Sequence, residues 1–309
     1  MEVVMAASEA KVLEKPVAIS LKRILIATDF SPASERALWH GLAIAHRFGA
    51  SVDIVHLVDS LGFRMTGTDV ITQAVELAKG DLRKLEAGLM GTGALTGMPH
   101  RMIVQEESEE VWKGLCRLVR ENDIDLVVLG AHGRRGLKKL FLGSVAEEVF
   151  RRSACPVLTV GPCVPAEIIP DAAPQHILFP TDLSRESLMG LPFAIEAARR
   201  CAAELILMHV LPELGGEAAG DRERVVESLR SQLQALLPRD AGLVHSPVCV
   251  VERGYFPDAI LEYAHTNEID LIILGLRTRE PYIERLVWQH AYRIVCEAHS
   301  PVLTIRSGR

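Results

Sequence analysis

The chain of 309 residues is long enough for two ordinary domains, and its 49% hydrophobic and 24% charged residues supply material for packed cores. A formal net charge of -6 and an isoelectric point near 6.0 argue against a protein that coats nucleic acid or an anionic membrane, because such binding surfaces are usually basic. We therefore expect neither partner, and any anion site must be local.

Residues 1–20 mix alanine and valine with charged residues such as Glu9 and Lys11, so no apolar run has signal-peptide length. We expect a flexible lead-in there. Elsewhere the longest apolar runs are strand-sized and far shorter than the ~20 residues of a membrane-spanning helix, which predicts a cytoplasmic protein. The six cysteines form no CxxC pair and have no histidines at zinc-finger spacing, so we expect neither a disulfide framework nor a metal site.

From Arg23 onward, short β-rich runs alternate with helical patterns. Ser31 is placed to cap a helix that begins at Pro32. Strands are expected at 23–29, 51–59, 100–106, 125–130 and 156–160, and further helices at 74–90, 108–124 and 144–153. Nearly continuous apolar strands alternating with helices predict a parallel sheet covered on both faces, and such sheets bind ligands at the carboxyl ends of their strands.

The second half of the chain repeats the first. Residues 176–211 match 23–58 without a gap, NDIDLVVLG recurs as NEIDLIILG, and CPVLTV recurs as SPVLTI. Four prolines in the fifteen residues between the halves suit an extended linker. We predict an α/β protein of two tandem domains, each with a five-stranded parallel sheet and helices on both faces. The expected boundaries are a lead-in at 1–20, domains at 21–161 and 176–309, and a linker at 162–175.

The segment GAHGRRGLKKLFLGS, residues 130–144, follows the fourth strand and precedes a helix. Glycines let backbone N–H groups approach a ligand, and the first turn of a helix from Ser144 offers unpaired donors. With the Ser144 hydroxyl and the basic residues, these donors favour a phosphate chain as ligand; a solvated basic loop is the alternative. The basic residues are Arg134, Arg135, Lys138 and Lys139. The glycine spacing fits neither GxxxxGK[ST] nor GxGxxG.

The spacing of Gly130, Gly133, Gly143 and Ser144, with DLVVLG before it and SVAEEVFRRSACPVLTV after it, resembles the nucleotide-binding signature of the universal stress protein family. KRILIATDFSPASERAL, DIVHLV and PVLTV resemble the first strand and helix, the second strand and the final strand of that family. The resemblance covers nearly the whole chain, in two tandem domains. It implies a Rossmann-like fold of the adenine nucleotide α hydrolase type and ATP, alone or with Mg²⁺, as ligand.

By the same resemblance, the adenine and ribose lie against the ends of the first two strands and the phosphates lie in the glycine loop. The implied contact residues are Ala27, Thr28 and Asp29 near the base and ribose, Leu57 beside the adenine, and Leu129, Gly130, Gly133, Gly143, Ser144, Val145 and Ala146 around the ribose and phosphates. The Asp29 carboxylate would accept a hydrogen bond from the ribose or the adenine amine. Because Asp182 repeats Asp29, both could instead organise the turn after the first strand.

His56 and its repeat His209 are interpreted as core histidines rather than catalytic bases. In the second half, the positions of Gly133, Gly143 and Ser144 carry Thr278, Trp288 and Gln289, and Glu280 and Pro281 fall in the former loop. A tryptophan there should obstruct a phosphate, so the second domain is expected not to bind ATP in the family manner. The alternative is a different anion site built from Arg277, Arg279 and Arg285.

The leading functional hypothesis is an ATP-binding regulatory or stress-response protein, with the loop surface around Arg134 to Leu142 turned to an unidentified protein partner. A slow ATPase or nucleotide transferase is the alternative, although only Asp29 and His132 offer a base. A structural protein with a vestigial site is a third. The family's last strand pairs with its copy in a partner subunit; here the tandem can pair its two final strands internally as a pseudo-dimer, and a further homodimer stays open.

Overall fold

A computed structural model describes residues 19–61, 68–131, 142–165, 173–213, 219–238, 240–276 and 281–306. The chain divides into two compact units, one over Ser20–Ala172 and one over Ala173–Arg309. Most of the expected lead-in, residues 1–18, and the middle of the expected linker, residues 166–172, lie outside the described residues.

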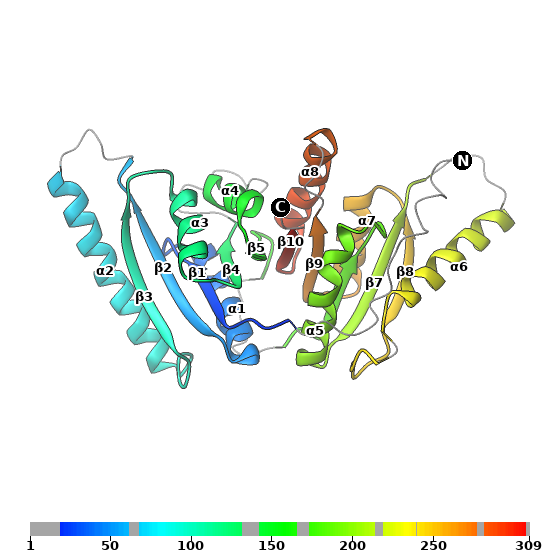
Figure 1. Ribbon diagram of the computed structural model, residues 1–309, viewed down its shortest axis with the longest axis horizontal. Helices are drawn as coiled ribbons and strands as arrows, with labels where there is room; N and C mark the ends of the chain where they lie inside the picture. Colours follow the sequence, from blue (N-terminus) through cyan, green and yellow to red (C-terminus); the bar gives the residue numbers. More distant parts are fainter. Residues whose placement is uncertain are drawn as a thin grey trace. The chain divides into compact units, whose positions relative to one another are not determined.

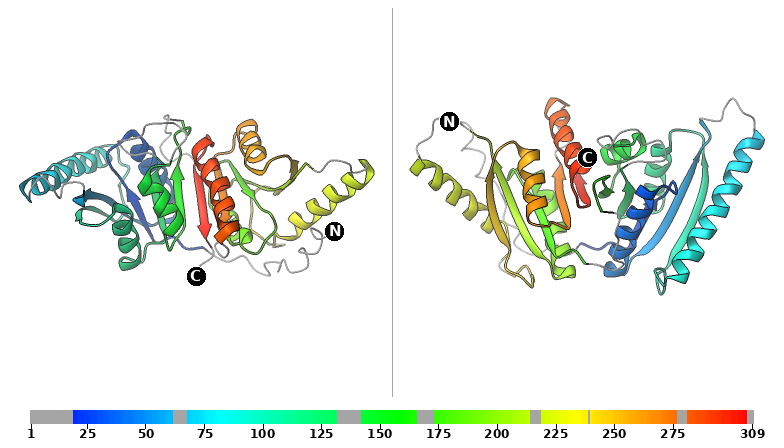
Figure 2. Two further views of the ribbon diagram at one scale, coloured as in Figure 1. Left: turned by 90° about the horizontal axis from the view of Figure 1, so that it is seen from above. Right: turned by 180° about the vertical axis from the view of Figure 1, so that it is seen from behind.

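The first unit alternates strands and helices as expected (Figure 1). Its elements are β1 (Arg23–Ala27), α1 (Pro32–Phe48), β2 (Ser51–Asp59), α2 (Thr68–Gly91), β3 (His100–Glu107), α3 (Val111–Glu121), β4 (Leu126–Gly130), α4 (Ser144–Arg152) and β5 (Val157–Val160). The strands are parallel and lie in the order β3-β2-β1-β4-β5. Helices α1 and α2 cover one face of this sheet, and α3 and α4 cover the other (Figures 1 and 2).

The second unit repeats this arrangement. Its elements are β6 (His176–Pro180), a 3₁₀ turn (Ser187–Gly190), α5 (Leu191–Cys201), β7 (Glu204–Leu211), α6 (Ala219–Ala235), β8 (Val248–Arg253), α7 (Phe256–Thr266), β9 (Leu271–Leu276), α8 (Pro281–Glu297) and β10 (Val302–Arg306). The strands are again parallel, in the order β8-β7-β6-β9-β10. The predicted fold class, two tandem α/β domains with a five-stranded parallel sheet each, is confirmed.

The core of each unit lies on both faces of its sheet, which explains the nearly continuous apolar strands. In the first unit, Ile24, Leu25 and Ile26 of β1 are at most 1% exposed. In the second unit, Phe179 of β6 is fully buried in a cluster with residues of α5, β7 and β9. Burying both faces of the central strands fixes them in the sheet, so that their carboxyl ends form a rigid edge.

Helix α3 begins at Val111, later than the Ser108 expected from its pattern. Glu107 is 1% exposed, and its carboxylate accepts a hydrogen bond from the Glu109 N–H (3.1 Å). The same carboxylate forms an ion pair with Arg117. The hydrogen bond from Glu109 holds the residues after β3 in a turn and delays the helix.

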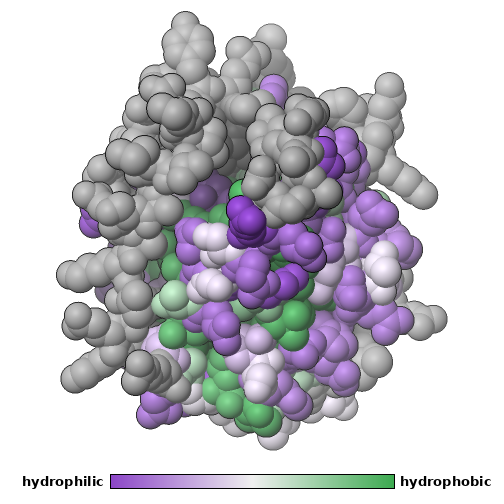
Figure 3. Space-filling view, turned by 90° about the vertical axis from the view of Figure 1, so that its right-hand side faces the viewer, coloured by the Kyte–Doolittle hydropathy of each residue, from purple (hydrophilic) through white to green (hydrophobic). Residues whose placement is uncertain are grey.

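One face of the surface is drawn in Figure 3, and its coloured part is mostly hydrophilic. Figure 3 looks at the second unit from the side of α6 and β8, and hydrophobic residues form only small areas there. Val225, Val244 and Val248 are exposed apolar residues of this unit, and scattered exposures of this kind are normal for a folded domain. Among the described residues, no helix combines the length and apolar composition that crossing a membrane requires.

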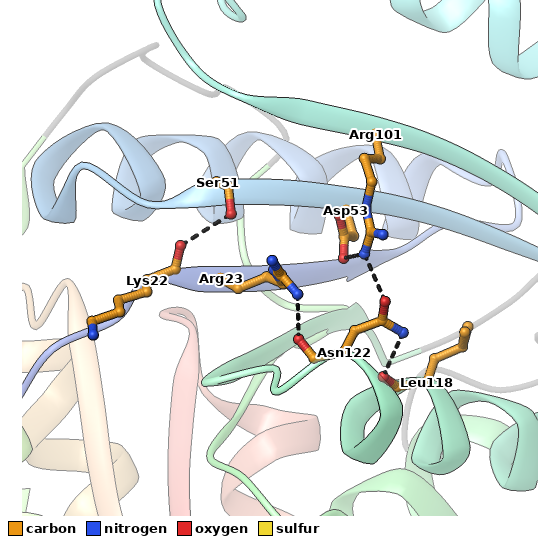
Figure 4. Close-up of polar contacts among 7 residues, drawn as sticks. All are labelled: Lys22, Arg23, Ser51, Asp53, Arg101, Leu118 and Asn122. Atoms are coloured by element: carbon orange, nitrogen blue, oxygen red, sulfur yellow. Dashed lines mark hydrogen bonds and ion pairs between the residues drawn. The ribbon is translucent and has the colours of Figure 1, made fainter.

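An ion pair joins β2 to β3 near their amino-terminal ends (Figure 4). Asp53 is 3% exposed and accepts from Arg101 Nε (2.7 Å) and Arg101 Nη2 (2.5 Å). Arg101 Nη2 also donates to Asn122 Oδ1 (2.9 Å), and Arg23 Nη1 donates to the Asn122 carbonyl (2.6 Å). The network ties the end of α3 to three strands. In the second unit, the corresponding pair is apolar, Ile206 opposite Val248.

Helices α1 and α5 both end with a residue in the left-handed conformation, Gly49 (φ 64°) and Ala202 (φ 52°). An alanine strains this conformation and a glycine does not. Ala202→Gly is therefore expected to raise the free energy of unfolding of the second unit by about 0.5–1 kcal/mol, and Gly49→Ala to lower that of the first unit by a similar amount. Urea denaturation measures both changes.

A Cβ at Gly49 would have no other atom within 4 Å, so backbone strain alone is tested there. If both substitutions shifted stability in the same direction, the strain argument would be wrong.

Candidate functional site

The turn after β1 is held by hydrogen bonds among its own residues. The Ser31 N–H donates to Asp29 Oδ1 (3.1 Å), and the Phe30 N–H donates to Thr28 Oγ1 (3.1 Å). Phe30 has a positive φ of 60°, which a non-glycine residue adopts only where its surroundings hold it there. The Ser31 hydroxyl accepts from the Ser34 N–H (3.2 Å), which confirms the predicted cap of α1.

The second unit repeats this turn bond for bond. The Ser184 N–H donates to Asp182 Oδ1 (2.9 Å), and the N–H of Leu183, whose φ is 63°, donates to Thr181 Oγ1 (3.0 Å). Both aspartates therefore organise the turn after the first strand of their unit. A ligand contact by Asp29 stays a prediction.

His56 is hydrogen-bonded and half-buried, so the expected hydrogen bond is present although the side chain is not fully in the core. Its Nδ1 lies 2.8 Å from the Thr28 carbonyl oxygen, and its ring centroid lies 4.6 Å from that of Phe30. His209 makes the same bond to the Thr181 carbonyl (2.8 Å). Because a carbonyl only accepts, each Nδ1 carries the proton, and both histidines serve to tie the first strand's turn to the second strand.

Gly130 allows the end of β4 to lie directly against the first turn of α1. A Cβ at Gly130 would lie 2.7 Å from the Ala33 carbonyl carbon and oxygen and 2.9 Å from the Ser34 nitrogen. Gly275 meets the Ser187 carbonyl in the same way. This packing role of Gly130 was not predicted from the sequence, where Gly130 was expected to contact a ligand; the retention of Gly275 in the second half is the signal that indicates it.

The sheet order brings most of the predicted contact residues to one edge. The carboxyl ends of β2, β1 and β4 are neighbours there. Buried among these residues are Thr28, Leu57, Leu129 and Ala146; half-buried are Ala27, Asp29, Gly130, Gly143 and Val145; Ser144 is exposed. Gly133 lies outside the described residues, as do His132 and the basic residues at 134, 135, 138 and 139.

The first N–H groups of helix α4 have no hydrogen-bond partner among the described residues. Gly143 is its N-cap, with the Gly143 N–H donating to the Ala131 carbonyl (2.6 Å) and the Glu147 N–H donating to the Gly143 carbonyl (2.9 Å). The N–H groups of residues 144–146 precede the first intrahelical bond, and no side chain among the described residues caps them. These three N–H groups and the positive end of the helix dipole form an anion-binding arrangement at the carboxyl edge of the sheet.

In the second unit, α8 removes this arrangement. The backbone is helical from Pro281, so Gln289, His290 and Ala291, which correspond to residues 144–146, lie inside the helix. Their N–H groups donate to carbonyls one turn earlier and are not available to a ligand. The side chains of Arg285 and Trp288 lie outside the described residues, as do Arg277 and Arg279. The predicted obstruction by Trp288 and the alternative anion site therefore stay predictions.

Polar contacts hold the start of α7 to α8. The Tyr255 hydroxyl lies 3.0 Å from His290 Nε2, and the ring of Phe256 lies 5.8 Å from that of His290. Burial and the nearby Arg293 lower the pKa of His290. The contacts of His290 with Tyr255 and Phe256 thus hold α8 against the start of α7. His290 corresponds to Val145 of α4.

The sequence model of the universal stress protein family matches residues 20–161 and 174–306. The chain belongs to the universal stress protein family. It is similar to universal stress protein Rv2005c of Mycobacterium tuberculosis, with 38% identity over 195 residues that cover 60% of this chain and 63% of the relative. Universal stress protein MJ0577 of Methanocaldococcus jannaschii is 27% identical over 169 residues, which cover 47% of this chain and 97% of the relative.

Among solved structures, the chain is similar to a universal stress protein from Archaeoglobus fulgidus, with a TM-score of 0.68 and 16% identity. The likeness covers 93% of this chain and 98% of that one, and it shows the fold. The family resemblance inferred from the sequence is confirmed for both halves by the match of the family model.

Proposed function

We propose that this universal stress protein is a nucleotide-dependent regulatory protein of the stress response, which binds ATP in its first domain (residues 21–161) and not in its second (residues 176–309). The observation that carries the proposal is the difference between two helix starts. Helix α4 presents three N–H groups beside Gly143 that have no partner within the described part of the chain, whereas the corresponding N–H groups of α8 lie inside a helix that begins at Pro281.

The surrounding residues support an adenine nucleotide in the first domain. The ends of β1 and β2 lie beside one another, and the turn at Thr28 and Asp29 is held rigid by hydrogen bonds to its own backbone. A nucleotide that reaches from this turn to the start of α4 would join two parts of the sheet edge. It would shift the population of the segment between β4 and α4 toward one arrangement, which a partner protein could recognise.

Two further features belong to this proposal. Strands β5 and β10 each lie at one end of their unit's strand order, which supports an intramolecular pseudo-dimer through these strands.

ATP hydrolysis is the alternative function, and Asp29 is its candidate base. Because Asp29 already accepts the Ser31 N–H, its geometry favours a binding role over proton transfer.

Calorimetric titration with ATP, with and without Mg²⁺, tests the proposal. We expect one site per chain and much weaker binding of adenosine, because adenosine lacks the phosphates that the α4 donors would bind. Two equivalent sites would contradict the restriction to the first domain, and no binding would contradict the function. Steady phosphate release that Asp29→Ala abolishes would favour the enzyme instead.

A further inference from the structure

The last residue of α4 is fastened to the first turn of α3. The Arg152 guanidinium carbon lies 4.8 Å from the ring centroid of Trp112, within the range of a cation–π contact. Arg152 Nε also pairs with Glu148, one turn earlier in α4. The Trp112 indole N–H donates to Glu110 Oε2 (2.5 Å), and this bond lowers the pKa of Glu110. We call these four residues the α3–α4 clamp.

The clamp joins the first turn of α3 to the last turn of α4. Glu110 is the N-cap of α3, at the carboxyl edge of the sheet, and Glu148 lies in the middle of α4. Because Glu148 and Trp112 contact the same guanidinium from two helices, they restrict the rotation of α4 relative to α3.

The direction of α4 matters because it is short. Nine residues make a helix roughly 13 Å long, so a tilt of about 10° around Arg152 would move its first turn by about 2 Å. A shift of that size is enough to break an N–H···O hydrogen bond. The N–H groups of residues 144–146 can meet a phosphate only while the far end of α4 is fixed.

In the second unit, α7 and α8 correspond to α3 and α4, and ion pairs join them in place of the cation–π contact. Arg293 Nη2 lies 2.6 Å from Asp258 Oδ1, and Arg293 Nε lies 3.0 Å from Glu297 Oε1. Asp258, Arg293 and Glu297 correspond to Lys113, Glu148 and Arg152, so all three charges are exchanged between the copies. Each copy therefore has its own contact between these two helices, but only in the first copy does the second helix begin at residues 144–146, whereas the corresponding residues 289–291 lie inside α8.

We propose that Trp112 and Arg152 are positioning residues, which fix α4 so that its first turn faces the phosphates of a bound nucleotide. The inference rests on the proposed function for its ligand. It predicts that ATP and adenosine respond differently, because a tilted α4 loses its contacts to the phosphates, whereas the contacts to the base come from β1 and β2.

Titration of the full chain with ATP and with adenosine tests whether the two ligands respond differently to changes in the clamp. Trp112→Ala and Arg152→Ala are expected to weaken ATP binding about two- to fivefold, the size of an exposed cation–π contact, and to affect adenosine binding less. Trp112→Phe, which keeps an aromatic face, should restore most of the ATP affinity. Equal losses for ATP and adenosine would overturn the inference.

Arg151→Ala is the matched control. Arg151 is the neighbouring residue of α4, it has the same charge, and its side chain is 45% exposed against 54% for Arg152. Its partner is Glu147, at 3.9 Å. If Arg151→Ala weakened ATP binding as much as Arg152→Ala, loss of charge rather than of the clamp would explain the effect.

Hydrogen exchange of the α4 amides without nucleotide tests the clamp independently of ATP. We expect faster exchange in Arg152→Ala and Trp112→Ala and unchanged exchange in Arg151→Ala. Unchanged exchange in all three variants would overturn the clamp. Absence of ATP binding by the unaltered protein would overturn the proposed function, while the exchange rates would still decide whether the clamp fixes α4.

Discussion

Gly143→Trp is expected to weaken ATP binding at least about 100-fold, and the loss follows from the start of α4. Gly143 is the N-cap, and its backbone lies beside the N–H groups of residues 144–146. An indole there would occupy the volume next to these donors. Each hydrogen bond from a backbone N–H to a charged oxygen contributes about 1.5–3 kcal/mol, so loss of two is enough for the expected factor. Calorimetric titration with ATP measures it.

Trp288→Gly is the matched control, because Trp288 occupies the position of Gly143 in the second copy. We expect this variant to keep one ATP site per chain, since the backbone of α8 is helical from Pro281 whatever the residue at 288. A second site in Trp288→Gly would show that the side chain, and not the longer helix, excludes the nucleotide. Unchanged affinity in Gly143→Trp would rule out a phosphate site at α4.

Arg101→Val is expected to lower the free energy of unfolding of the first unit by about 2–3 kcal/mol. It would leave the carboxylate of the buried Asp53 side chain without its charged partner. Breaking a fully buried ion pair costs about 3–5 kcal/mol, and the expected value is smaller because the Arg101 side chain is 50% exposed. Urea denaturation followed by circular dichroism measures the change.

The second unit supplies the control for this prediction. The double variant Asp53→Ile with Arg101→Val copies the pair of Ile206 and Val248 and is expected to lie within about 1 kcal/mol of the unaltered protein, because no charge is then left without a partner. If the double variant were as unstable as Arg101→Val, the packing of the arginine stem rather than the ion pair would account for the loss.

Much of the fold could be predicted because local patterns and long-range repetition agree. The cap at Ser31, the helix start at Pro32 and the strand alternation are each encoded within a few residues. The packing role of Gly130 was not predictable from its own segment. It depends on Ala33 and Ser34, which are about a hundred positions earlier and meet β4 only in the folded sheet.

The start of α8 shows how one residue type supports two interpretations. Pro281 was expected to lie in an altered loop, but it is the first residue of α8. Proline interrupts a helix interior but suits its first position, where its missing N–H would have no partner. The interpretation of Pro281 therefore depended on where the helix begins. The first copy predicts a helix start at the position of Gln289, whereas α8 begins eight residues earlier.

The exchange of charges between the two helix pairs also bears on how a duplicated chain folds. Two similar halves on one polypeptide can dock a helix onto the wrong copy during folding. If α4 docked on α7, Glu148 would face Asp258, and if α8 docked on α3, Arg293 would face Lys113. Each mismatch places like charges together, which disfavours exchanged helices, whereas the correct docking of α8 on α7 keeps the ion pair of Arg293 and Asp258.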